Sequence, residues 1–565
     1  MGLNGALQIG RSAILSSQAA MNIAGNNMAN AATPGYHRQI ARLSPSNPGA
    51  IGRNQFVGTG VQLVSVNRAI DTALQMRLRA AISDQNAAEI DYRFMSAIET
   101  LQNELTGDDL SSRLSAFFNA FSELGNNPTD HAVRTVVLQQ GSSLTGHINS
   151  LRDEYTVIRQ EVDRSLGVNV QQVDGLLNEI AAMNTQISMA EGGAGGEASS
   201  LRDQRDQIID ELSQYLEVTT VEQQNGSVDV LVNSIPIVLA GESRGLELRT
   251  ESGPNGSEVS IRVGADGTTL DIRTGTIGAL VRQREDSIAP AIDAIDEFSS
   301  QLIFQVNNLH AQGVGTSGRQ SILGLTQVAD PSANLNADGS GIPWKMTNGT
   351  FQVHVVDSQT GERITHQVQV DPENMSLEDL VNEMNTVLDI PNLTASVDTS
   401  GRLSIAADNG FEVSFSEDET GVLASLGMNA FFGGSDASDI VIDQVLLDDP
   451  SLLAASSDFT SGGNGIALQM AGLQDQAIED LGGASLRQFW QSAVNDQAVR
   501  TGAAANTLQS SRLVKDSLDA QNASVSGVSI DEEAIDLMTL QRQFQAAARF
   551  VTVIDETMDV LMGIV

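Results

Sequence analysis

The segment LMTLQRQFQAAARFVTVIDETMDVLMGIV, residues 537–565, carries two interleaved rows of apolar residues. Neighbours within a row are seven positions apart, and the rows are Leu537, Phe544, Val551, Met558 and Val565, and Leu540, Ala547, Ile554 and Leu561. A heptad with both core positions apolar is typical of a helix that packs in a coiled coil. The segment therefore predicts a long terminal helix with an apolar stripe that needs a partner.

Residues 3–30 carry a second heptad stripe and predict another helix. Leu7, Ile14, Met21 and Met28 recur every seven residues, whereas the offset row contains mostly small residues. Small residues let two helices approach closely but bury little apolar area. We expect the two helices alone to form a marginal domain, because ordering the backbone costs more free energy than this burial contributes.

Two interpretations of the terminal stripes remain open. In the first, the two helices pair within one chain and dock on the rest of the molecule. In the second, both ends become ordered when many copies pack side by side. The second explains why both ends carry the pattern and why no polar segment follows Val565.

Composition limits the classes of protein to consider. The 565 residues have room for roughly three to five domains. Aromatic residues make up only 4%, so the cores must be built mainly from aliphatic residues. The formal net charge of -40 argues against binding to nucleic acid or to an anionic membrane, because both carry negative charge.

The sequence contains no cysteine, which excludes disulfides, thiol nucleophiles and thiolate metal sites. This absence fits either a reducing compartment or a chain that is exported unfolded. The N-terminal segment has no continuous apolar core of the kind that a secretory signal requires. Apolar runs also stay shorter than the ~18–20 residues of a membrane span. We therefore expect a protein without membrane insertion that is either soluble or exported by a route that reads no cleavable signal peptide.

The middle of the chain predicts a rod of long helices. A heptad run extends from Leu144 to Ile187 with a slip near Leu166, which is typical of a stutter. The sequence LRDQRDQIIDELSQYL at 201–216 predicts a second helix, antiparallel to the first. Further helices are expected at 71–106, at 274–311 with a kink at Pro290, and at 484–521.

Two segments instead alternate between apolar and polar residues. Residues 218–273 contain short alternating runs separated by Gly-rich turns, which predicts antiparallel strands. Residues 326–457 predict a mixed module with a hairpin across SQTG and a short helix capped by Ser376 and Asp379. The segment LSPSNPGAIGRNQ at 43–55 is expected to be an extended loop.

The order of these segments predicts a nested α+β multidomain fold with both termini at one end. The expected domains are a terminal coiled coil (1–55 and 526–565), a helical rod domain (56–217, 274–325 and 458–525), a β domain (218–273) and an outer mixed β domain (326–457).

Three parts of the sequence carry a family resemblance. NNMANAATPGYHRQ at 26–39 resembles the N-terminal signature of bacterial flagellar axial proteins, and residues 526–565 resemble their C-terminal signature. The helical sequences at 201–218 and 275–313 are similar to those of the hook-associated protein 1 family, the first hook–filament junction proteins. The N-terminal motif residues are Ala29, Asn30, Thr33, Pro34, Gly35 and Tyr36.

The resemblance implies a structural protein that takes part in flagellum assembly and motility. It implies export through the flagellar type III system, a short stay in the cytoplasm, and a final extracellular position at the hook–filament junction. The implied partners are other copies in a ring, the hook protein, the second junction protein, and an export chaperone on the C-terminal helix. The implied interface joins residues of the two terminal stripes: Leu7, Ile14, Met21, Met28, Leu537, Leu540, Phe544, Val551, Ile554, Met558 and Leu561.

The residues themselves offer no catalytic or metal-binding motif. GVGTSG at 313–318 fits a dinucleotide-binding pattern by letter but follows a helix end, so we interpret it as a loop. Six histidines are scattered without metal-ligand spacing, although His354 and His366 face each other if the predicted hairpin pairs them. The Asp-rich stretches lack the spacing of a calcium loop. We therefore expect neither an enzyme nor a cofactor.

Two alternatives to the junction protein stay in view. The chain is also compatible with another flagellar axial protein, a hook or rod component. A different class is a secreted protein whose residues 326–457 carry an adhesive or enzymatic activity. A binding or hydrolase assay on that segment discriminates between these classes.

Overall fold

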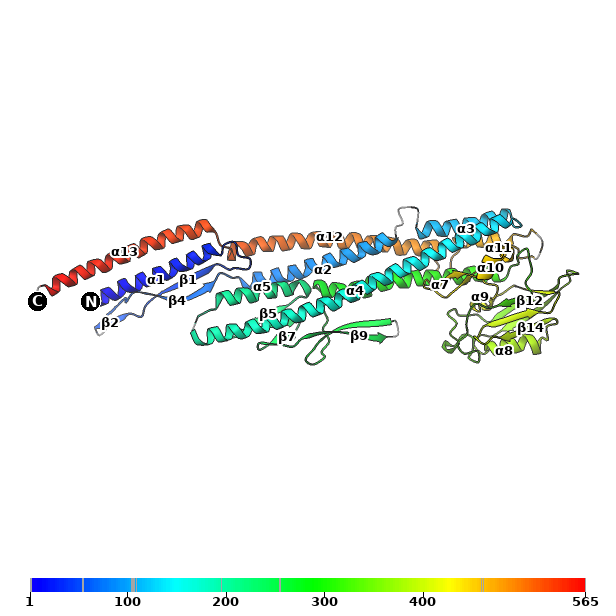
Figure 1. The fold of residues 1–565 in the computed structure, drawn as a ribbon, viewed down its shortest axis with the longest axis horizontal. Helices are drawn as coiled ribbons and strands as arrows, with labels where there is room; N and C mark the ends of the chain where they lie inside the picture. The colour runs from blue at the N-terminus through cyan, green and yellow to red at the C-terminus, as the bar shows by residue number, and fades with distance from the viewer. Residues whose placement is uncertain are drawn as a thin grey trace. The chain divides into compact units, whose positions relative to one another are not determined.

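The computed structural model describes residues 3–563 except 53–54, 103–106, 108, 195, 254–255, 459 and 461. Figure 1 shows the order of the elements along the chain. The chain forms two compact units: the first contains residues 1–93, 162–283 and 503–565, and the second contains 94–161 and 284–502. The fold is α+β, as the sequence predicts, and the finer division into four domains stays a prediction.

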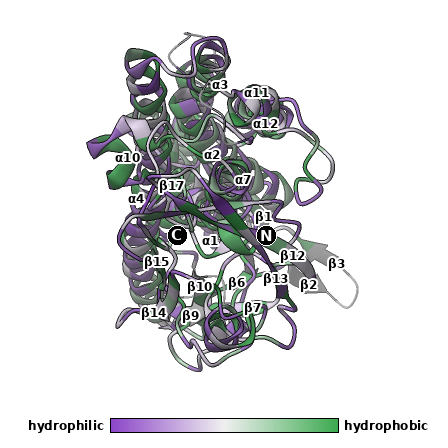
Figure 2. Cartoon of the chain, turned by 90° about the vertical axis from the view of Figure 1, so that its right-hand side faces the viewer, coloured by the Kyte–Doolittle hydropathy of each residue, from purple (hydrophilic) through white to green (hydrophobic). Residues whose placement is uncertain are grey.

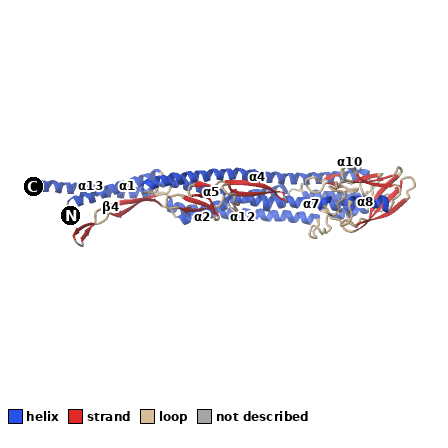
Figure 3. Ribbon diagram, turned by 90° about the horizontal axis from the view of Figure 1, so that it is seen from below, coloured by secondary structure: helices blue, strands red, loops and turns tan. Residues whose placement is uncertain are grey.

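The two ends of the chain meet in the first unit. Helices α1 and α13 lie side by side, with the strand β4 beside α1 (Figures 1 and 3). The elements of this part are α1 (Leu3–Ala29), β1 (Gln39–Pro45), β2 (Gly49–Gly52), β3 (Gln55–Val57), β4 (Val61–Arg68) and α13 (Ile530–Met562). Both predicted terminal helices are confirmed, and Val565 lies outside the described residues.

The predicted loop at 43–55 is wrong in part. Strand β1 begins at Gln39, ends at Pro45 and pairs antiparallel with β4, while β2 pairs with β3. Pairing starts with Gln39 opposite Arg68 and shifts register between Arg42 and Leu43. A proline is tolerated at the end of an edge strand, so Pro45 does not exclude the strand. The partner lies outside the local window, so local sequence pattern alone did not reveal it.

The rest of the first unit combines long helices with a small β module. The helices are parts of α2 (Thr72–Gln102), α4 (His131–Ala194) and α12 (Leu486–Ser526), together with α5 (Ser199–Tyr215) and α6 (Gly275–Arg282). The strands are β5 (Thr219–Glu222), β6 (Val228–Val232), β7 (Ile235–Leu239), β8 (Glu242–Ser243), β9 (Leu246–Gly253) and β10 (Gly256–Val263). Strands β5 to β8 form one antiparallel sheet in chain order, and β9 pairs with β10. The predicted antiparallel module at 218–273 is therefore confirmed.

The predicted heptad run lies in α4, which is one continuous helix of 64 residues. Its stripe is buried on both sides of the slip at Leu166, as shown by Leu144, Ile148, Leu151, Tyr155, Val162, Val173, Leu177, Ile180 and Ile187. Figure 2 shows hydrophilic and hydrophobic residues on the same helices, the pattern of helices with one buried face.

The second unit adds several helices around α7. They are α3 (Leu110–Asn126), α7 (Ala289–Ala311), α9 (Val422–Ser425), α10 (Gln444–Asp448) and α11 (Gly465–Leu473). The side chain of Asp109 caps α3 by accepting from the Ser112 amide at 2.7 Å. The sequence analysis did not identify α3, although this Asp before an apolar run is a helix-start signal.

The kink expected at Pro290 takes a different form. Residues Gln283–Ile288 form a π-helical turn, and Pro290 lies in the first turn of α7. Proline is well tolerated there, because its missing N–H would have no partner within the helix. The irregular turn therefore precedes the proline.

The second unit also contains the mixed β module. Its elements are β11 (Ser321–Leu323), a 3₁₀ turn (Asp338–Ser340), β12 (Gly349–Asp357), β13 (Arg363–Val370), α8 (Leu377–Asn382), a π-helical turn (Glu383–Val387), β14 (Leu393–Val397), β15 (Leu403–Ala407), β16 (Phe411–Ser416), β17 (Phe432–Gly433), β18 (Val441–Ile442) and a 3₁₀ turn (Pro450–Leu452). Its two larger sheets have the orders β13–β12–β16 and β11–β15–β14. The SQTG hairpin is confirmed, and so is the capping box of Ser376 and Asp379.

The expected pairing of two histidines across the hairpin is wrong by one position. His354 lies opposite Thr365, and His366 lies opposite Val353. Successive side chains on a strand point to opposite faces, so the two imidazoles are on different faces of the sheet. The His354 ring contacts the hydroxyls of Thr365 and Ser416 at 2.8 and 2.7 Å. Burial, followed by the charge of Arg363, lowers the pKa of His354 to about 4.

A second buried histidine, His310, lies in an aromatic core. Its ring centroid is 5.7 Å from that of Phe431, which packs edge-on against Phe432. The His310 Nδ1–H donates to the carbonyl of Asn429 at 2.7 Å, and Nε2 accepts from the Ala454 amide at 2.9 Å. Both nitrogens are satisfied by the neutral ring, and burial lowers the pKa of His310 to about 3.

This histidine predicts an acid-sensitive second unit. The folded-state pKa lies below the ordinary value of 6.5, so the unfolded state binds more protons between pH 6.5 and about 3. The free energy of unfolding should therefore fall as the pH drops below 6.5, with a His310 contribution of about 1.4 kcal/mol per pH unit. The emission of Trp344 and Trp490, both in the second unit, reports this unfolding. His310→Gln should be less stable at pH 7, but its free energy of unfolding should change less between pH 6 and 4. Equal pH slopes in the two proteins would contradict the role of His310 in this acid sensitivity.

Candidate functional site: the paired terminal helices and their anchors

Helices α1 and α13 pack antiparallel. Asn27, near the end of α1, contacts Glu533 in the first turn of α13. Gly10, near the start of α1, lies against Val551 in the second half of α13. The stripe of α13 lies on the side that packs against α1: Ile554 is buried, and Leu540, Phe544 and Val551 are half-buried.

Gly10 marks the closest approach of the two helices. A Cβ built on Gly10 would lie 2.5 Å from Cγ2 of Val551 and 3.3 Å from Cδ1 of Phe550. Valine is stiff at χ1, so Val551 has little freedom to move aside. The small offset row of α1 therefore has a specific use, because it permits contact with the large residues of α13.

The structure places the predicted interface residues as follows. Ile554 is buried, Leu561 is exposed, and the others are half-buried: Leu7, Ile14, Met21, Met28, Leu537, Leu540, Phe544, Val551 and Met558. The first of the two open interpretations, pairing within one chain, is thus present. However, half-burial of so many apolar residues leaves the pair without a closed core.

Large apolar side chains of α13 also remain exposed, including Phe550, which lies partly against Gly10 of α1. On α13 the strongly exposed residues are Ile530, Ile535, Met538, Phe550, Val553, Val560, Leu561 and Met562. Nearby, Leu15 on α1 and Val64 on β4 are each 54% exposed. Many large apolar residues exposed on one helix indicate an interaction surface. We call this set the outer apolar row.

A polar cluster closes the end of the helix pair where the chain leaves α1. The Asn27 amide nitrogen donates to Glu533 Oε2 at 3.1 Å and to the carbonyl of Gln39 at 2.9 Å. The side-chain oxygen of Asn27, Oδ1, accepts from the Tyr36 hydroxyl at 2.8 Å and from the Gln39 backbone amide at 2.9 Å. Arg38 Nε donates to Glu533 Oε1 at 2.6 Å. We call these five residues the Asn27 cluster.

Burial and charge both act on Tyr36 in the Asn27 cluster. Burial, then the negative charges of Asp203 and Glu533, raise its pKa to about 12. The hydroxyl is therefore protonated and acts as a donor at neutral pH. The cluster satisfies a glutamate that is only 2% exposed, which is the condition for burying a charge.

The N-terminal motif forms the turn that brings these groups together. Thr33 and Pro34 are exposed, and Gly35 has φ of 73°, a conformation that favours glycine. Asn30 donates to the carbonyl of Asn26 at 3.0 Å at the end of α1, and Ala29 is exposed. The motif therefore has a structural role, because its turn reverses the chain and brings Tyr36 back to α1.

The other side of α1 is held by the β hairpin. The Ser12 hydroxyl accepts from the Val61 amide at 3.2 Å, and the Ser16 hydroxyl donates to the Val61 carbonyl at 3.4 Å. Gly60 has φ of 115°, and a side chain there would collide with Ser12. The serines in α1, unremarkable in sequence, thus attach β4 to the helix.

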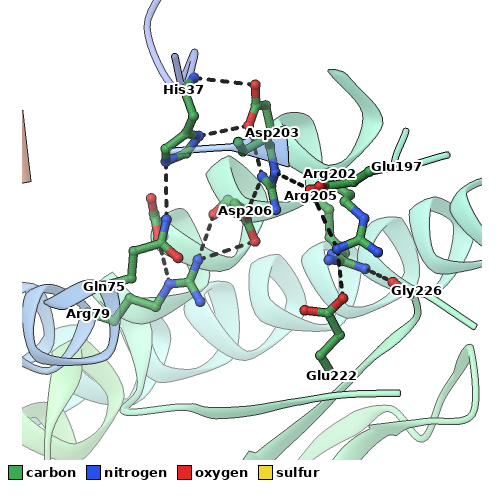
Figure 4. Close-up of polar contacts among 12 residues, drawn as sticks. His37, Gln75, Arg79, Glu197, Arg202, Asp203, Arg205, Asp206, Glu222 and Gly226 are labelled. Carbon is green, nitrogen blue, oxygen red and sulfur yellow. Dashed lines mark hydrogen bonds and ion pairs between the residues drawn. The ribbon is translucent and has the colours of Figure 1, made fainter. Parts of the chain in front are cut away.

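An ion-pair cluster attaches the hairpin to helices α2 and α5 (Figure 4). Arg68 on β4 pairs with Asp203 at 2.8 Å and with Asp206 at 2.6 Å. His37 Nδ1 lies 2.7 Å from the Asp203 carboxylate, and its Nε2 lies 3.1 Å from the side-chain nitrogen of Gln75. The positive charges around Asp206 outweigh its burial and lower its pKa. The terminal segment is therefore joined to the body of the first unit by buried charges.

Sequence reasoning missed Asn27, Arg38, Asp203 and Glu533. A signal existed for two of them: Asn27 interrupts an otherwise apolar or small row, and Glu533 is an acid in the first turn of an apolar helix. Their meeting depends on the antiparallel pairing, which the sequence does not specify.

The arrangement offers packing surfaces and no catalytic constellation. Among the described residues, no group of His, Asp and Glu is placed to hold a metal ion. Within the same part of the chain, no helix combines the length and apolar character that crossing a membrane requires.

Comparisons with known proteins converge on flagellar axial proteins. A model of the flagellar hook-associated protein FlgK helical domain matches residues 95–322. The C-terminal model of the flagellar basal body rod proteins FlgEFG matches 520–564, and the flagellin hook IN motif matches 357–409.

The chain is also similar to full-length relatives and to a solved structure. The chain is 25% identical to flagellar hook-associated protein 1 of Escherichia coli, with 98% of each chain covered. The identity is 23% with that of Bacillus subtilis, over 98% of this chain and 96% of the relative. A flagellar hook junction protein structure from Burkholderia pseudomallei covers 80% of this chain and 100% of its own, with TM-score 0.49 and 16% identity.

The close approach at Gly10 predicts opposite effects for two glycine substitutions in α1. Gly25→Ala, where no atom would meet the new Cβ within 4 Å, should stabilise the helix pair by up to about 1 kcal/mol through helix propensity. Gly10→Ala should destabilise it by about 1–3 kcal/mol, because the methyl group meets Val551. Hydrogen exchange of α13 amides measures both, and Val551→Ala should relieve the Gly10→Ala defect. Equal effects of the two glycine variants would overturn the packing geometry.

The Asn27 cluster predicts a charge-specific defect. Asn27→Asp places a second carboxylate beside Glu533 and removes a donor, so the helix pair should lose about 2–3 kcal/mol at pH 7. Asn26→Asp makes the same amide-to-carboxylate change at the neighbouring position, which is exposed, and serves as the control. Hydrogen exchange of the α1 and α13 amides should become faster only in Asn27→Asp. The difference from the unchanged protein should become smaller as the pH falls, because the carboxylates are then protonated. Similar exchange in both variants would exclude the proposed role of Asn27.

Proposed function

We propose, from the premise that this chain belongs to the flagellar hook-associated protein 1 family, that its α1–α13 pair packs against the same pair in neighbouring copies. The protein is a structural, non-enzymatic component of the flagellum, at the hook–filament junction. Its work is to hold subunits together, so the interface takes the place of an active site.

The observation that carries this proposal is the outer apolar row. Val553, Val560 and Leu561 are 55%, 64% and 51% exposed although they lie on a helix that already has an intramolecular partner. A helix that serves only one chain has a polar outer face. Covering this row by neighbouring copies would bury the apolar area that the single pair leaves in water.

Exposed charges fit contact between copies. Arg11 is the charged residue on the exposed face of α1, and Asp555, Glu556 and Asp559 are exposed near the end of α13. Opposite charges on neighbouring helices steer association and fix its register. Packing of α1 from one copy beside α13 of the next brings these groups within reach.

Assembly with other axial components of the flagellum follows from the family. The finer partners are part of our proposal: a ring of this protein with hook protein on one side and the second junction protein on the other. Before assembly, an export chaperone covers the stripe of α13 in the cytoplasm. The final position is outside the cell at the hook–filament junction.

Two features support export as an unfolded chain through the flagellar type III system. The sequence has no cysteine, so no crosslink obstructs passage. The contact between α1 and α13 consists of half-buried apolar stripes and the Asn27 cluster, and half-buried apolar contacts open at lower cost than a closed core. We also propose that residues 218–273 and 326–457 are outer domains that do not contribute to the helical interface.

Removal of residues 537–565 tests the proposal. The truncated chain should keep the emission of Trp344 and Trp490, because both belong to the second unit, but it should fail to join isolated hooks. Electron microscopy or sedimentation with hooks measures this. Joining that persists after truncation would contradict the proposal.

A point variant separates the outer row from the stability of the helix pair. Val553→Asp should keep α13 helical and leave thermal unfolding unchanged within about 0.5 kcal/mol, because the residue is exposed. Joining to hooks should nevertheless fall at least about tenfold, the effect of a charge in an apolar contact. Val441→Asp, equally exposed at 55% in the second unit, is the matched control and should join normally.

A further inference from the structure

A polar cavity of about 390 Å³ lies in the first unit between β4, the start of α2, helix α5 and strands β5 and β6. Four arginines line it: Arg68, Arg79, Arg202 and Arg205. Three carboxylates also line it, from Glu197, Asp206 and Glu222. Three of the arginines have further partners outside the lining: Arg68 pairs with Asp203, Arg79 with Asp210 and Arg202 with Glu191.

The carboxylates of the lining are already committed to three of the arginines. Asp206 pairs with Arg68 at 2.6 Å and lies 3.6 Å from Arg79. Glu222 pairs with Arg202 at 2.7 Å. Glu197 pairs with Arg68 at 3.0 Å and lies 3.7 Å from Arg202. Figure 4 labels Arg79, Asp206, Arg202 and Glu222 among the residues that make these contacts.

Arg205 is the exception. It is only 1% exposed, and its Nη1 donates to two neutral oxygens, Asn184 Oδ1 at 3.1 Å and the Gly226 carbonyl at 2.7 Å. Its Nε has no hydrogen-bond partner, and no described carboxylate forms an ion pair with it. Burial lowers the pKa of Arg205 in spite of the charge of Asp206. A guanidinium stays charged at any physiological pH, so a buried positive charge remains without a direct counter-ion.

We propose that this cavity binds a small oxyanion, a phosphate or carboxylate group, that supplies the counter-ion for Arg205. A guanidinium edge matches the geometry of two oxygens of such a group. Thr72 and Thr220 add neutral donors to the lining. A cation is disfavoured by the positive charge of Arg205, and an apolar ligand by the many polar groups of the lining.

The bound group links parts of the chain that are distant in sequence. Residues 68–79 belong to the hairpin and α2, whereas 197–228 belong to α5 and the adjacent strands. An anion bound to Arg205 in this cavity lies between groups from both segments. Binding should therefore stabilise the attachment of the terminal segment to the body of the first unit.

The test uses the full-length protein and titrates sodium phosphate and sodium acetate separately, against sodium chloride at the same ionic strength. The stability of the attachment is measured from the rate of hydrogen exchange at the α5 amides. A rise in stability that saturates with phosphate alone identifies phosphate, and one that saturates with acetate alone identifies a carboxylate source, such as an acidic side chain. Saturation with both identifies a general oxyanion site, and saturation with neither overturns the proposal.

Arg205→Met provides the variant, because it removes the charge and keeps much of the side-chain volume. Binding of whichever probe saturates should weaken at least about tenfold, the loss expected for a charged hydrogen-bonded pair. Arg273→Met, which removes an exposed arginine of the same unit, should bind as the unchanged protein does. If Arg205→Met fails to fold, Arg205→Lys keeps the charge and should bind more weakly but measurably. Equal anion stabilisation in the Arg205 and Arg273 variants would show a general salt effect and contradict the site.

Discussion

The contact between α1 and α13 is the constraint on which the first unit depends. One helix supplies small residues, with Gly10 at the closest point, and the other supplies a stripe of large ones. This pairing brings the two ends of the chain together and places Asn27 beside Glu533. It leaves a second apolar row of α13 in water. The same contact therefore explains both the stability of one subunit and its need for neighbours.

Polar groups give this apolar contact a defined position. The Asn27 cluster fixes the end of the helix pair, and the ion pairs of Arg68 fix the hairpin to α5. Buried polar groups are stable only when every member has a partner, so they specify one arrangement where half-buried apolar stripes would tolerate several. Assembly can then proceed from subunits that all present the same outer row.

Much of the fold could be predicted from sequence because it rests on local periodicity. The heptads gave α1, α4 and α13, and the Ser376 capping box gave α8. The failures share a cause, since β1 and the meeting of Asn27 with Glu533 depend on partners far away in the chain. His354 was misplaced by a one-residue register, which no turn motif fixed. The stripe residues were named from the heptad, but spacing alone does not say which residues a single partner helix leaves exposed, so only the structure identifies the outer row.

Solvent accessibility at Val553, in the single subunit and in the assembled junction, tests the central claim most directly. The chain has no cysteine, so Val553→Cys introduces one unique thiol for labelling with a maleimide. The account predicts rapid labelling of the isolated subunit, because Val553 is exposed there, and strong protection once the subunit has joined a hook. Equal labelling rates in the two states would contradict it.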